Sequence, residues 1–499
     1  MVSFPTTNRR RTHALCLEHP IFKDASNRFN KCFPSKRPQY SRKTLKYTIG
    51  IAAAVVMLVS YFAFFPVENK GVYENFQNNT GYPSSVITQF KTNTTENQTN
   101  ETEKGNTDTG QDNKINTPTA SSPVLPLLKP LGIIGSASSI NRTVWKAVAE
   151  YAWKYFQPGT VDSATGLPAA GIGFPYFTDW DLGVYVQAVI DAQEIGLIEK
   201  EGPWGSDSRL EKVLTFLENR TLTNDALPFW FYQAADGNPA SQLTNRSGAI
   251  ADNGRLLVAL QNLKTYDNSL QTRVDNVVTS RMNCSFILTE LDTLVDSTNI
   301  YDYYVASGFA AFWPDKTTVP TSIIGNINSA PQISVNGGIL PISKISCEPV
   351  LLSIFDLEQP DPILFQLSRQ IYLAHEGWYN STGEYRAFSE GPTIPGTFAY
   401  EWVVLPDGRT WVVQDEQGSD LNISPVIYSK IAFSFLALYN TPFALKMVVY
   451  LENTLPDLGS GYCDGTHEDG RNKVDITGSN TNGLIISASR YAIQSGEWP

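Results

Sequence analysis

Histidine and cysteine are scarce in this chain of 499 residues, which has four of the former and five of the latter. Beyond residue 47 only His375, His467, Cys284, Cys347 and Cys463 remain. Three cysteines allow one disulfide at most, which excludes a disulfide-stapled scaffold. No Cys-x-x-Cys or His-x-x-x-His spacing occurs, and these are the usual signatures of a zinc site.

Motifs of several enzyme classes are also missing. The chain has no Gly-x-Ser-x-Gly and no Gly-x-x-x-x-Gly-Lys followed by Ser or Thr. A Ser-His-Asp or Cys-His set beyond residue 47 would have only two histidines to use. By elimination, chemistry there rests on carboxylates and aromatic rings. Glycoside hydrolysis uses such groups, with one carboxyl protonated to donate and another ionised to activate water or attack.

Charge is distributed very unevenly along the chain. Residues 1–47 contain eleven Lys or Arg against two acidic residues, which gives this segment a charge of about +9. The net charge of −11 then leaves about −20 on the remainder. So acidic a region is a poor partner for nucleic acid, because phosphate binding needs clustered Lys and Arg.

An uncharged apolar run, TIGIAAAVVMLVSYFAFF, follows the basic segment. It predicts a transmembrane signal anchor over residues 48–66, with a cytoplasmic tail over 1–47 and everything beyond outside the cell membrane. A cleavable signal peptide is the alternative, but the long basic region and the lack of a small-x-small site before Pro66 argue against it. Ten Asn-x-Ser/Thr sequons fit an extracellular glycoprotein.

Two further regions follow the anchor. Residues 67–135 are rich in Asn and Thr and poor in apolar residues, which predicts a disordered stalk. Residues 136–499 form the folded domain. Its helical periodicity recurs in eleven segments, at about 141–156, 179–196, 207–219, 250–264, 267–282, 301–312, 348–358, 361–375, 424–439, 441–452 and 480–494. One β-hairpin is expected at 400–416, around Pro-Asp-Gly.

Paired helices of this number fit a bundle, a solenoid or a closed toroid. No repeat of 34 to 47 residues is present, which weakens the solenoid. Six helical hairpins need about twelve helices, close to the eleven segments. We therefore expect an all-α protein, an (α/α)6 toroid with a small β-hairpin insertion, preceded by the transmembrane helix and the stalk.

Acidic residues recur at predicted helix starts. Asp179 and Asp181 flank Trp180, Asp252 precedes an apolar helix, and Glu348 comes just before a proline. Each of these carboxyls has a purely structural explanation, because an acidic side chain at a helix N-terminus caps free N–H groups and favours the dipole. Each is also a candidate for binding or chemistry at a helix end.

Two segments of the chain are similar to each other. GWYNSTGE, which ends at Glu384, aligns without a gap with GYCDGTHE, which ends at Glu468. Both have an aromatic residue at the second position, Trp378 and Tyr462 respectively. This similarity predicts two equivalent loops.

The segment GYCDGTHE and the residue after it also contain possible metal ligands. Cys463, Asp464, His467 and Glu468 are possible zinc ligands, but no second histidine is near. Calcium bound by Asp464, Glu468 and Asp469 is the alternative, although the EF-hand spacing is absent. We predict no metal or other cofactor and keep Ca²⁺ as the alternative.

The order of the blocks WDLGVYVQAVIDAQEIGLI, LPFWFY, DNGRLLVAL, YDYYVASGFAAFW, EPVLL and TGSNTNGLIISASRY resembles that of an uncharacterised glucoamylase-like family. This family is grouped with the six-hairpin (α/α)6 glycosidases, and the resemblance covers about residues 141–494. It implies a toroid with a glycan groove between acidic loops. The matching positions are Trp180, Asp181, Asp252, Arg255, Glu348, Glu384, Glu468 and Asn482. Cys463 and His467 depart from the plainer residues of relatives.

In a closed toroid, loops two hairpins apart open onto one face. We therefore expect Glu468 and Glu384 to be the acid and base, with Asp181 as third candidate. Trp378 and Tyr462 would raise the pKa of one carboxyl. The residues expected to bind substrate are Trp180, Asp179, Asp252, Arg255, Glu348, Trp378, Tyr462 and Asn482, with Arg255 more a structural partner of a nearby carboxylate than a substrate clamp.

The sequence thus predicts a membrane-anchored extracellular glycoside hydrolase or transglycosylase that acts on a polysaccharide or oligosaccharide and binds no nucleic acid. A non-catalytic cell-envelope glycan-binding protein on the same toroid is the alternative. A polysaccharide lyase fits less well, because lyases act on anionic uronates and this domain is strongly acidic.

Overall fold

The computed structural model describes residues 129–131, 136–393 and 397–495. The chain divides into two compact units, Met1–Phe64 and Phe65–Pro499, and every described residue belongs to the second. The predicted tail and membrane span, and the stalk apart from 129–131, lie outside the described residues. No helix within the described ranges is long and apolar enough to cross a membrane.

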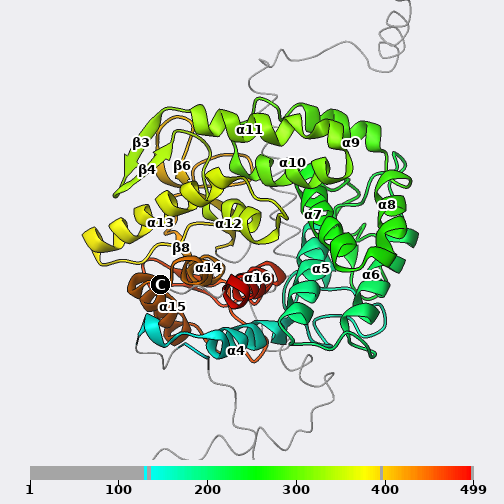
Figure 1. The fold of residues 1–499 in the computed structure, drawn as a ribbon, viewed down its shortest axis with the longest axis horizontal. Coiled ribbons are helices and arrows are strands. Elements are labelled where there is room, and N and C mark those ends of the chain that lie inside the picture. The colour runs from blue at the N-terminus through cyan, green and yellow to red at the C-terminus, as the bar shows by residue number, and fades with distance from the viewer. Residues whose placement is uncertain (1–128, 132–135, 394–396, 496–499) are drawn as a thin grey trace, which may run out of the picture. The chain divides into compact units, whose positions relative to one another are not determined.

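Thirteen α-helices occur among the described residues, and they form an inner and an outer ring (Figure 1). The inner ring holds α5 (Asp179–Glu194), α7 (Ile250–Tyr266), α10 (Ile300–Phe312), α12 (Cys347–Asp356), α14 (Ser429–Tyr439) and α16 (Ser479–Ser495). The outer ring holds α4 (Arg142–Trp153), α6 (Ser206–Asn219), α8 (Gln271–Thr279), α9 (Cys284–Asp292), α11 (Thr318–Ser329), α13 (Pro362–Thr382) and α15 (Pro442–Thr454). Because α16 packs against both α14 and α5, the inner ring closes on itself.

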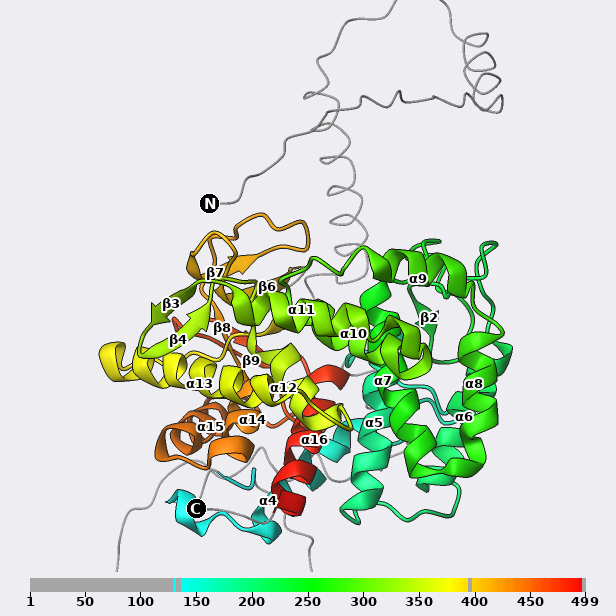
Figure 2. The same cartoon turned by 45° about the horizontal axis from the view of Figure 1, so that its top comes forward.

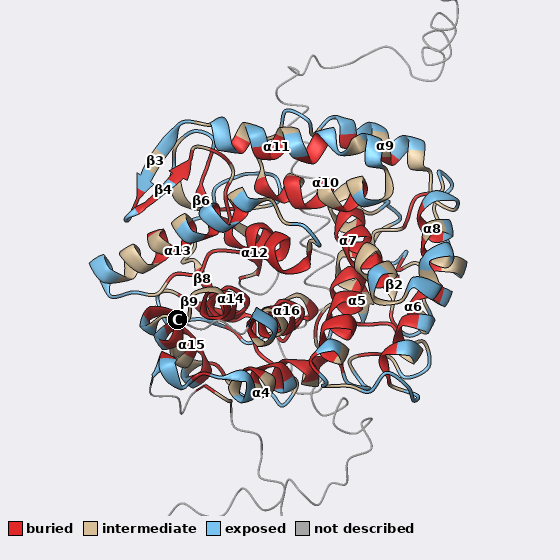
Figure 3. Cartoon of the chain, in the orientation of Figure 1, coloured by how far each residue is buried: buried red, intermediate tan, exposed pale blue. Residues whose placement is uncertain are grey.

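Hydrophobicity decides which helices lie inside. Every residue of α12 is buried, and α5, α7, α14 and α16 are buried on most sides (Figure 3). A helix that is apolar around its whole circumference is stable only when it is covered on all sides. The outer helices instead keep one exposed polar face, and they alternate with the inner helices along the chain except at α8 and α9, two consecutive outer helices.

Small antiparallel sheets extend the loops between the helices (Figure 2). The strands are β1 (Tyr176–Phe177) with β2 (Tyr232–Gln233), β3 (Gln332–Val335) with β4 (Gly338–Pro341), β5 (Glu390–Pro392) with β6 (Phe398–Val404) and β7 (Thr410–Gln414), and β8 (Val426–Tyr428) with β9 (Gly465–His467) and β10 (Lys473–Val474). The predicted hairpin at 400–416 is confirmed as β6–β7, and its turn contains Gly408 at φ +82°.

Three boundaries differ from the predicted ones. Helix α11 was not predicted, because Pro320, Gly325 and several β-branched residues lower its helix propensity, although a proline is tolerated in the first turn. The predicted helix at 267–282 is shorter, and α9 follows it as a separate helix. Helix α13 continues to Thr382, past the predicted end at residue 375.

Close contact between inner helices gives a test of this packing. A Cβ added at Gly254 of α7 would lie 2.8 Å from the Cα and 2.9 Å from the carbonyl oxygen of Val305 in α10. We expect Gly254→Ala to lower the free energy of unfolding by about 1–3 kcal/mol, because neither backbone can move freely. Gly325→Ala in α11, where nothing lies within 4 Å of the new Cβ, should raise it by about 0.5–1 kcal/mol. Urea unfolding of both variants checks this, and equal effects would contradict it.

Candidate active site

The first turns of the inner helices meet at one end of the ring. Ser479 of α16 donates a hydrogen bond to Asp181 of α5, with 2.7 Å between Oγ and Oδ1. Asn480 of α16 donates to Glu348 of α12 at 2.7 Å, and Lys430 of α14 donates to the same carboxyl at 2.5 Å. Contacts among first-turn residues require the N-termini of these helices to lie together, so the positive ends of their dipoles share one face.

A buried salt bridge lies at the centre of this face. The side chains of Glu348 and Lys430 are 0% and 2% exposed. Ser389 donates a further hydrogen bond to Glu348 at 2.7 Å, and Lys430 donates to the backbone carbonyl of Glu390 at 2.9 Å. Taking two charges out of water is costly unless each is paired and its remaining hydrogen-bonding capacity is used. Both conditions are met here, and the pair ties α12 to α14 and to β5.

Five carboxyls surround or belong to this salt bridge, and we call them the central acidic cluster: Asp181, Asp252, Glu348, Glu390 and Asp464. Burial, and then the negative charge of Glu348, raise the pKa of Glu390 to about 8, against the attraction of Lys430. Glu390 lies on β5 and is 8% exposed. At neutral pH it therefore holds a proton that it can donate.

The other members of the cluster differ in their environment. Burial, and then the charge of Asp179, raise the pKa of Asp252 to about 8, while burial raises that of Asp464 to about 6. Burial also raises the pKa of Asp181, but hydrogen bonds from Thr178 and Ser479 favour its ionised form. The charge of Asp181 acts on Asp252, and that of Asp252 acts on Glu390, so these three carboxyls are linked electrostatically. Asp181 and Asp252 are half-buried.

Aromatic rings flank the cluster. Tyr400 on β6 lies opposite Glu390 in the sheet register. Its ring stacks on Trp402, with centroids 6.0 Å apart and planes at 10°. Tyr301 of α10 packs edge-on against both, and Trp180 joins the same group. Tyr400 and Trp180 are half-buried and so partly accessible, as a face that stacks on a sugar ring must be.

Several buried polar atoms near these rings have no hydrogen-bond partner within the described part of the chain. They include Nε1 of Trp180, Nε1 of Trp402 and Oδ1 of Asn480. An unsatisfied buried donor or acceptor costs about 1–3 kcal/mol. Such atoms commonly mark a place that water or a polar ligand occupies.

Two of the predicted helix-start residues cap their helices. The hydroxyl of Thr178 and the carboxyl of Asp181 form a reciprocal capping box at the start of α5. Asp252 accepts a hydrogen bond from the backbone N–H of Ala249 at 3.2 Å. Asp179 makes a buried salt bridge of 2.5 Å with Arg220, which the sequence analysis did not single out. These capping contacts fix the carboxyls in place at the open end of the ring.

The prediction that Arg255 pairs with a nearby carboxylate at a helix start was wrong. Its guanidinium forms a buried salt bridge of 2.8 Å with Asp356, at the far end of α12, and contacts Tyr304. Arg255 lies nearly one turn beyond Asp252 along α7, so its side chain reaches across the interior of the ring. It is a structural partner, as expected, but of a different carboxylate.

Asn482 and Tyr462 lie in the packed interior. Oδ1 of Asn482 accepts a hydrogen bond from the backbone N–H of Tyr462 at 2.8 Å, and its Nδ2 donates to two carbonyls. The hydroxyl of Tyr462 donates to Glu452. Both side chains are almost fully buried, and these contacts hold the loop after α15 against α16.

The two similar segments do not fold alike, so the prediction of equivalent loops was wrong. GWYNSTGE is helical up to Thr382, at the end of α13, whereas GYCDGTHE runs into strand β9. The residues that the two segments share adopt different backbone conformations. Those of GYCDGTHE lead into β9, which pairs with β8, whereas those of GWYNSTGE form the last turns of α13. Glu384 is exposed, just beyond a left-handed Gly383 that ends α13.

Glu468 is held by a long-range salt bridge. Arg386 binds it through two hydrogen bonds, of 2.6 and 2.7 Å, and both side chains are 7% exposed. The guanidinium carbon lies 3.6 Å from the ring centre of Trp378, so the cation covers one face of this ring. Burial raises the pKa of Glu468 against the attraction of Arg386. Glu384 acts on Glu468 electrostatically, but neither residue contacts the central acidic cluster through a hydrogen bond among the described residues.

The loop considered for metal binding is occupied by internal contacts. Both ring nitrogens of His467 face carbonyl oxygens, Ser424 O at 2.6 Å and Thr393 O at 2.8 Å. The Cys463 thiol donates to a carbonyl. Within the described ranges, no group of three or more His, Cys, Asp or Glu is arranged to hold a metal ion.

Three residues of the central site were not predicted from the sequence. Lys430 could have been noticed, because it is the one charge in the apolar stretch SKIAFSFLALY, and a lysine is rarely buried unless it is paired. Glu390 and Tyr400 give no local signal, since their role depends on β5 pairing with β6.

These features define the class of protein. Six inner helices inside a ring of outer helices, with Asp181, Asp252 and Glu348 in the first turns of inner helices, form an (α/α)6 toroid. The family model described as a protein of unknown function, DUF3131, matches residues 147–495, so the chain belongs to this family. No curated protein matches the chain.

Solved structures share this fold. A candidate glucoamylase from Bacteroides caccae is 15% identical, with a TM-score of 0.51 over 71% of this chain and 94% of that one. A second, from Bacteroides uniformis, is 13% identical, with a TM-score of 0.50 over 72% and 92%. An endo-β-1,2-glucanase from Chitinophaga pinensis is 15% identical, with a TM-score of 0.49 over 72% and 94%. The resemblance drawn from the sequence is thus confirmed in the fold.

The central salt bridge should dominate stability at this face. We expect Lys430→Met to lower the free energy of unfolding by about 3–5 kcal/mol, because it leaves Glu348 buried without a cation. The matched control is Lys316→Met, which breaks a partly exposed pair with Asp292 and should cost less than about 1 kcal/mol. Urea unfolding measures both, and a small effect at Lys430 would contradict the buried-pair analysis.

Stability should also depend on pH through Glu390. In the folded protein this carboxyl keeps a proton that the unfolded chain releases above about pH 4. The contribution of Glu390 to the free energy of unfolding is therefore greatest below about pH 4 and is lost as the pH rises towards about 8. We expect Glu390→Gln to reduce this loss, and Glu358→Gln, at an exposed site, to leave it unchanged. Denaturant titrations at a series of pH values test this, and identical slopes in the parent and Glu390→Gln would refute it.

Proposed function

We propose that this protein is a glycoside hydrolase or transglycosylase, with Glu390 as proton donor and Asp181 as base. The observation that carries the proposal is the electrostatically linked set Asp181, Asp252 and Glu390, near the gathered N-termini of the inner helices and beside partly accessible aromatic rings. The solved structures of similar fold include candidate glucoamylases, which supports a carbohydrate substrate.

Each residue has a definite task in this scheme. Glu390 gives its proton to the glycosidic oxygen as the bond to the anomeric carbon breaks. Asp181, whose carboxyl accepts hydrogen bonds from Thr178 and Ser479, takes a proton from the water or sugar hydroxyl that attacks the same carbon. Asp252, which is linked electrostatically to both, binds sugar hydroxyls. Trp180 and Tyr400 stack on the sugar, and the ring N–H of Trp180, which has no partner within the described part of the chain, donates to one of its hydroxyls.

We further propose that the protein acts outside the cell, anchored by residues 48–66, on a polysaccharide or oligosaccharide and not on nucleic acid. The apolar run, the basic residues before it and the sequons support this location. Protease treatment of intact cells should remove the toroid and spare the tail. Protection of the toroid would refute this topology.

A non-catalytic glycan-binding protein is the second candidate. It is favoured by one observation, that both carboxylate oxygens of Asp181 already accept hydrogen bonds from Thr178 or Ser479. The pair suggested by the sequence, Glu384 and Glu468, also stays a prediction. The following experiment tests both the glycan-binding protein and the catalytic pair Glu384 and Glu468 against the proposed enzyme.

We expect Glu390→Gln and Asp181→Asn each to lower kcat by about 10²–10⁴-fold, as removal of a general acid or base does. The parent is first incubated with a polysaccharide panel, and released sugars are measured. In the parent, kcat/KM should fall above about pH 8, where Glu390 loses its proton.

Glu358→Gln is the control and should keep full activity. Loss of activity in Glu384→Gln and Glu468→Gln, with activity retained in Glu390→Gln, would transfer the acid and base roles to the pair suggested by the sequence. Glycan binding without product release by the parent would identify a binding protein instead.

A further inference from the structure

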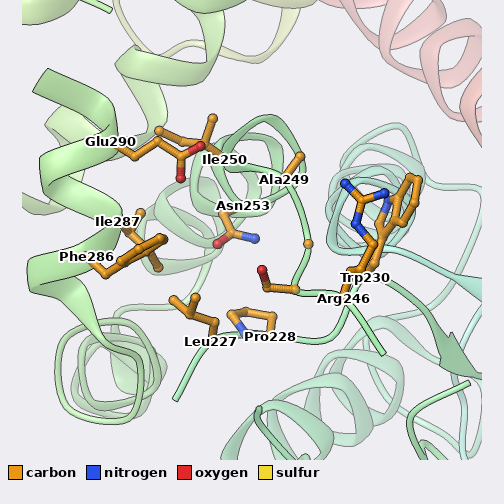
Figure 4. A pocket seen from close by; sticks show the side chains of 12 residues that line it. Leu227, Pro228, Trp230, Arg246, Ala249, Ile250, Asn253, Phe286, Ile287 and Glu290 are labelled. Carbon is orange, nitrogen blue, oxygen red and sulfur yellow. The ribbon is translucent and has the colours of Figure 1, made fainter. Parts of the chain in front are cut away.

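A cavity of about 480 Å³ opens beside the candidate active site, between α9 and the loop that leads into α7 (Figure 4). Its size is typical of a site for a small molecule. Two stretches of the loop are paired with each other, with Trp230 N–H donating to Arg246 at 2.9 Å and Gly248 N–H donating to Pro228 at 3.0 Å. The cavity wall is therefore built before any ligand arrives.

The lining combines apolar and polar groups. Phe286 and Ile287 of α9 lie on one side in Figure 4, and Trp230 and Arg246 lie opposite. Phe286 is 55% exposed, so part of its ring is accessible to a ligand. Arg246 lies over the ring of Trp230, with 5.6 Å between the guanidinium carbon and the ring centre.

The charges of the lining argue against an anionic ligand. Arg246 is balanced by Glu290 on the lining itself and by the nearby charge of Glu416. With Ser247 and Asn253, these groups offer both donors and acceptors. A pyranose ring, with apolar faces and a rim of neutral hydroxyls, matches such a surface better than a phosphate or a lipid chain does.

The cavity adjoins the central site through two of its lining residues. Asn253 lines it and also approaches Asp179, with 3.4 Å between Nδ2 and Oδ2. Ala249 lines it too, and its N–H holds Asp252. A glycan at Asp252 would have its next residues within reach of Phe286.

We propose that this cavity binds a further sugar residue of the glycan, so that the protein recognises a chain and not a single sugar. This inference rests on the proposed function for its choice of ligand. It assigns Phe286 and Trp230 as stacking residues and Arg246 and Glu290 as hydroxyl-binding residues.

Isothermal titration of the full chain with neutral gluco-oligosaccharides, from disaccharides to hexasaccharides of several linkages, tests the cavity. In the parent we expect affinity to rise at the length that first reaches the cavity. Phe286→Ala should remove this gain, roughly tenfold, and leave the shortest ligand unaffected. Phe365→Ala, which truncates a comparably exposed phenylalanine on α13, should change nothing.

The outcomes separate this inference from the proposed function. Binding that depends on chain length, without product release, would retain the cavity and reject the hydrolase. Product release with no effect of length or of Phe286→Ala would reject the cavity alone. Tighter binding of an alkyl glucoside, self-association lost in Phe286→Ala, or no binding by the parent at any length would each overturn the inference.

Discussion

The buried salt bridge between Glu348 and Lys430 is the interaction on which the open end of the toroid depends. It joins α12 to α14, and through Asn480 and the carbonyl of Glu390 it reaches α16 and β5. A buried charge without its partner would cost several kcal/mol. These elements must therefore keep their relative positions, and the surrounding carboxyls are held in fixed geometry as a consequence.

The same pair also sets the electrostatics of the site. The negative charge of Glu348 is one reason why Glu390 keeps its proton, and it raises the pKa of Asp464 as well. Lys430 opposes both effects from the other side. A structural ion pair and an acid with a raised pKa thus belong to one arrangement, which is how a single fold can keep one carboxyl protonated beside an ionised one.

Local periodicity predicted most of the helices, because a helix such as α4 has a buried apolar stripe and an exposed polar face. It failed where local and tertiary signals disagree. The Asn336-Gly337 turn of β3–β4 has both residues at positive φ, and Asn-Gly is a local hairpin signal, although no hairpin was predicted there. The two similar segments led to a wrong prediction of equivalent loops, because identical residues can adopt different backbone conformations. The salt bridge between Arg386 and Glu468 joins residues 82 positions apart, which no local pattern reveals.

Helix capping and chemistry are alternative explanations for the acidic residues at helix starts in the sequence. In the proposed scheme Asp181 does both. Asp181 lies in the first turn of α5, where backbone N–H groups and the helix dipole favour the carboxylate. Glu390 lies on a strand and has no helix end to stabilise its charge, so burial and Glu348 keep it protonated. Asp252 also lies in the first turn of a helix, α7, yet its pKa is raised to about 8 as well, so burial and neighbouring charges outweigh the helix end there. An (α/α)6 ring that gathers helix N-termini on one face therefore holds several carboxyls in place, and the inserted strand β5 adds Glu390 to them.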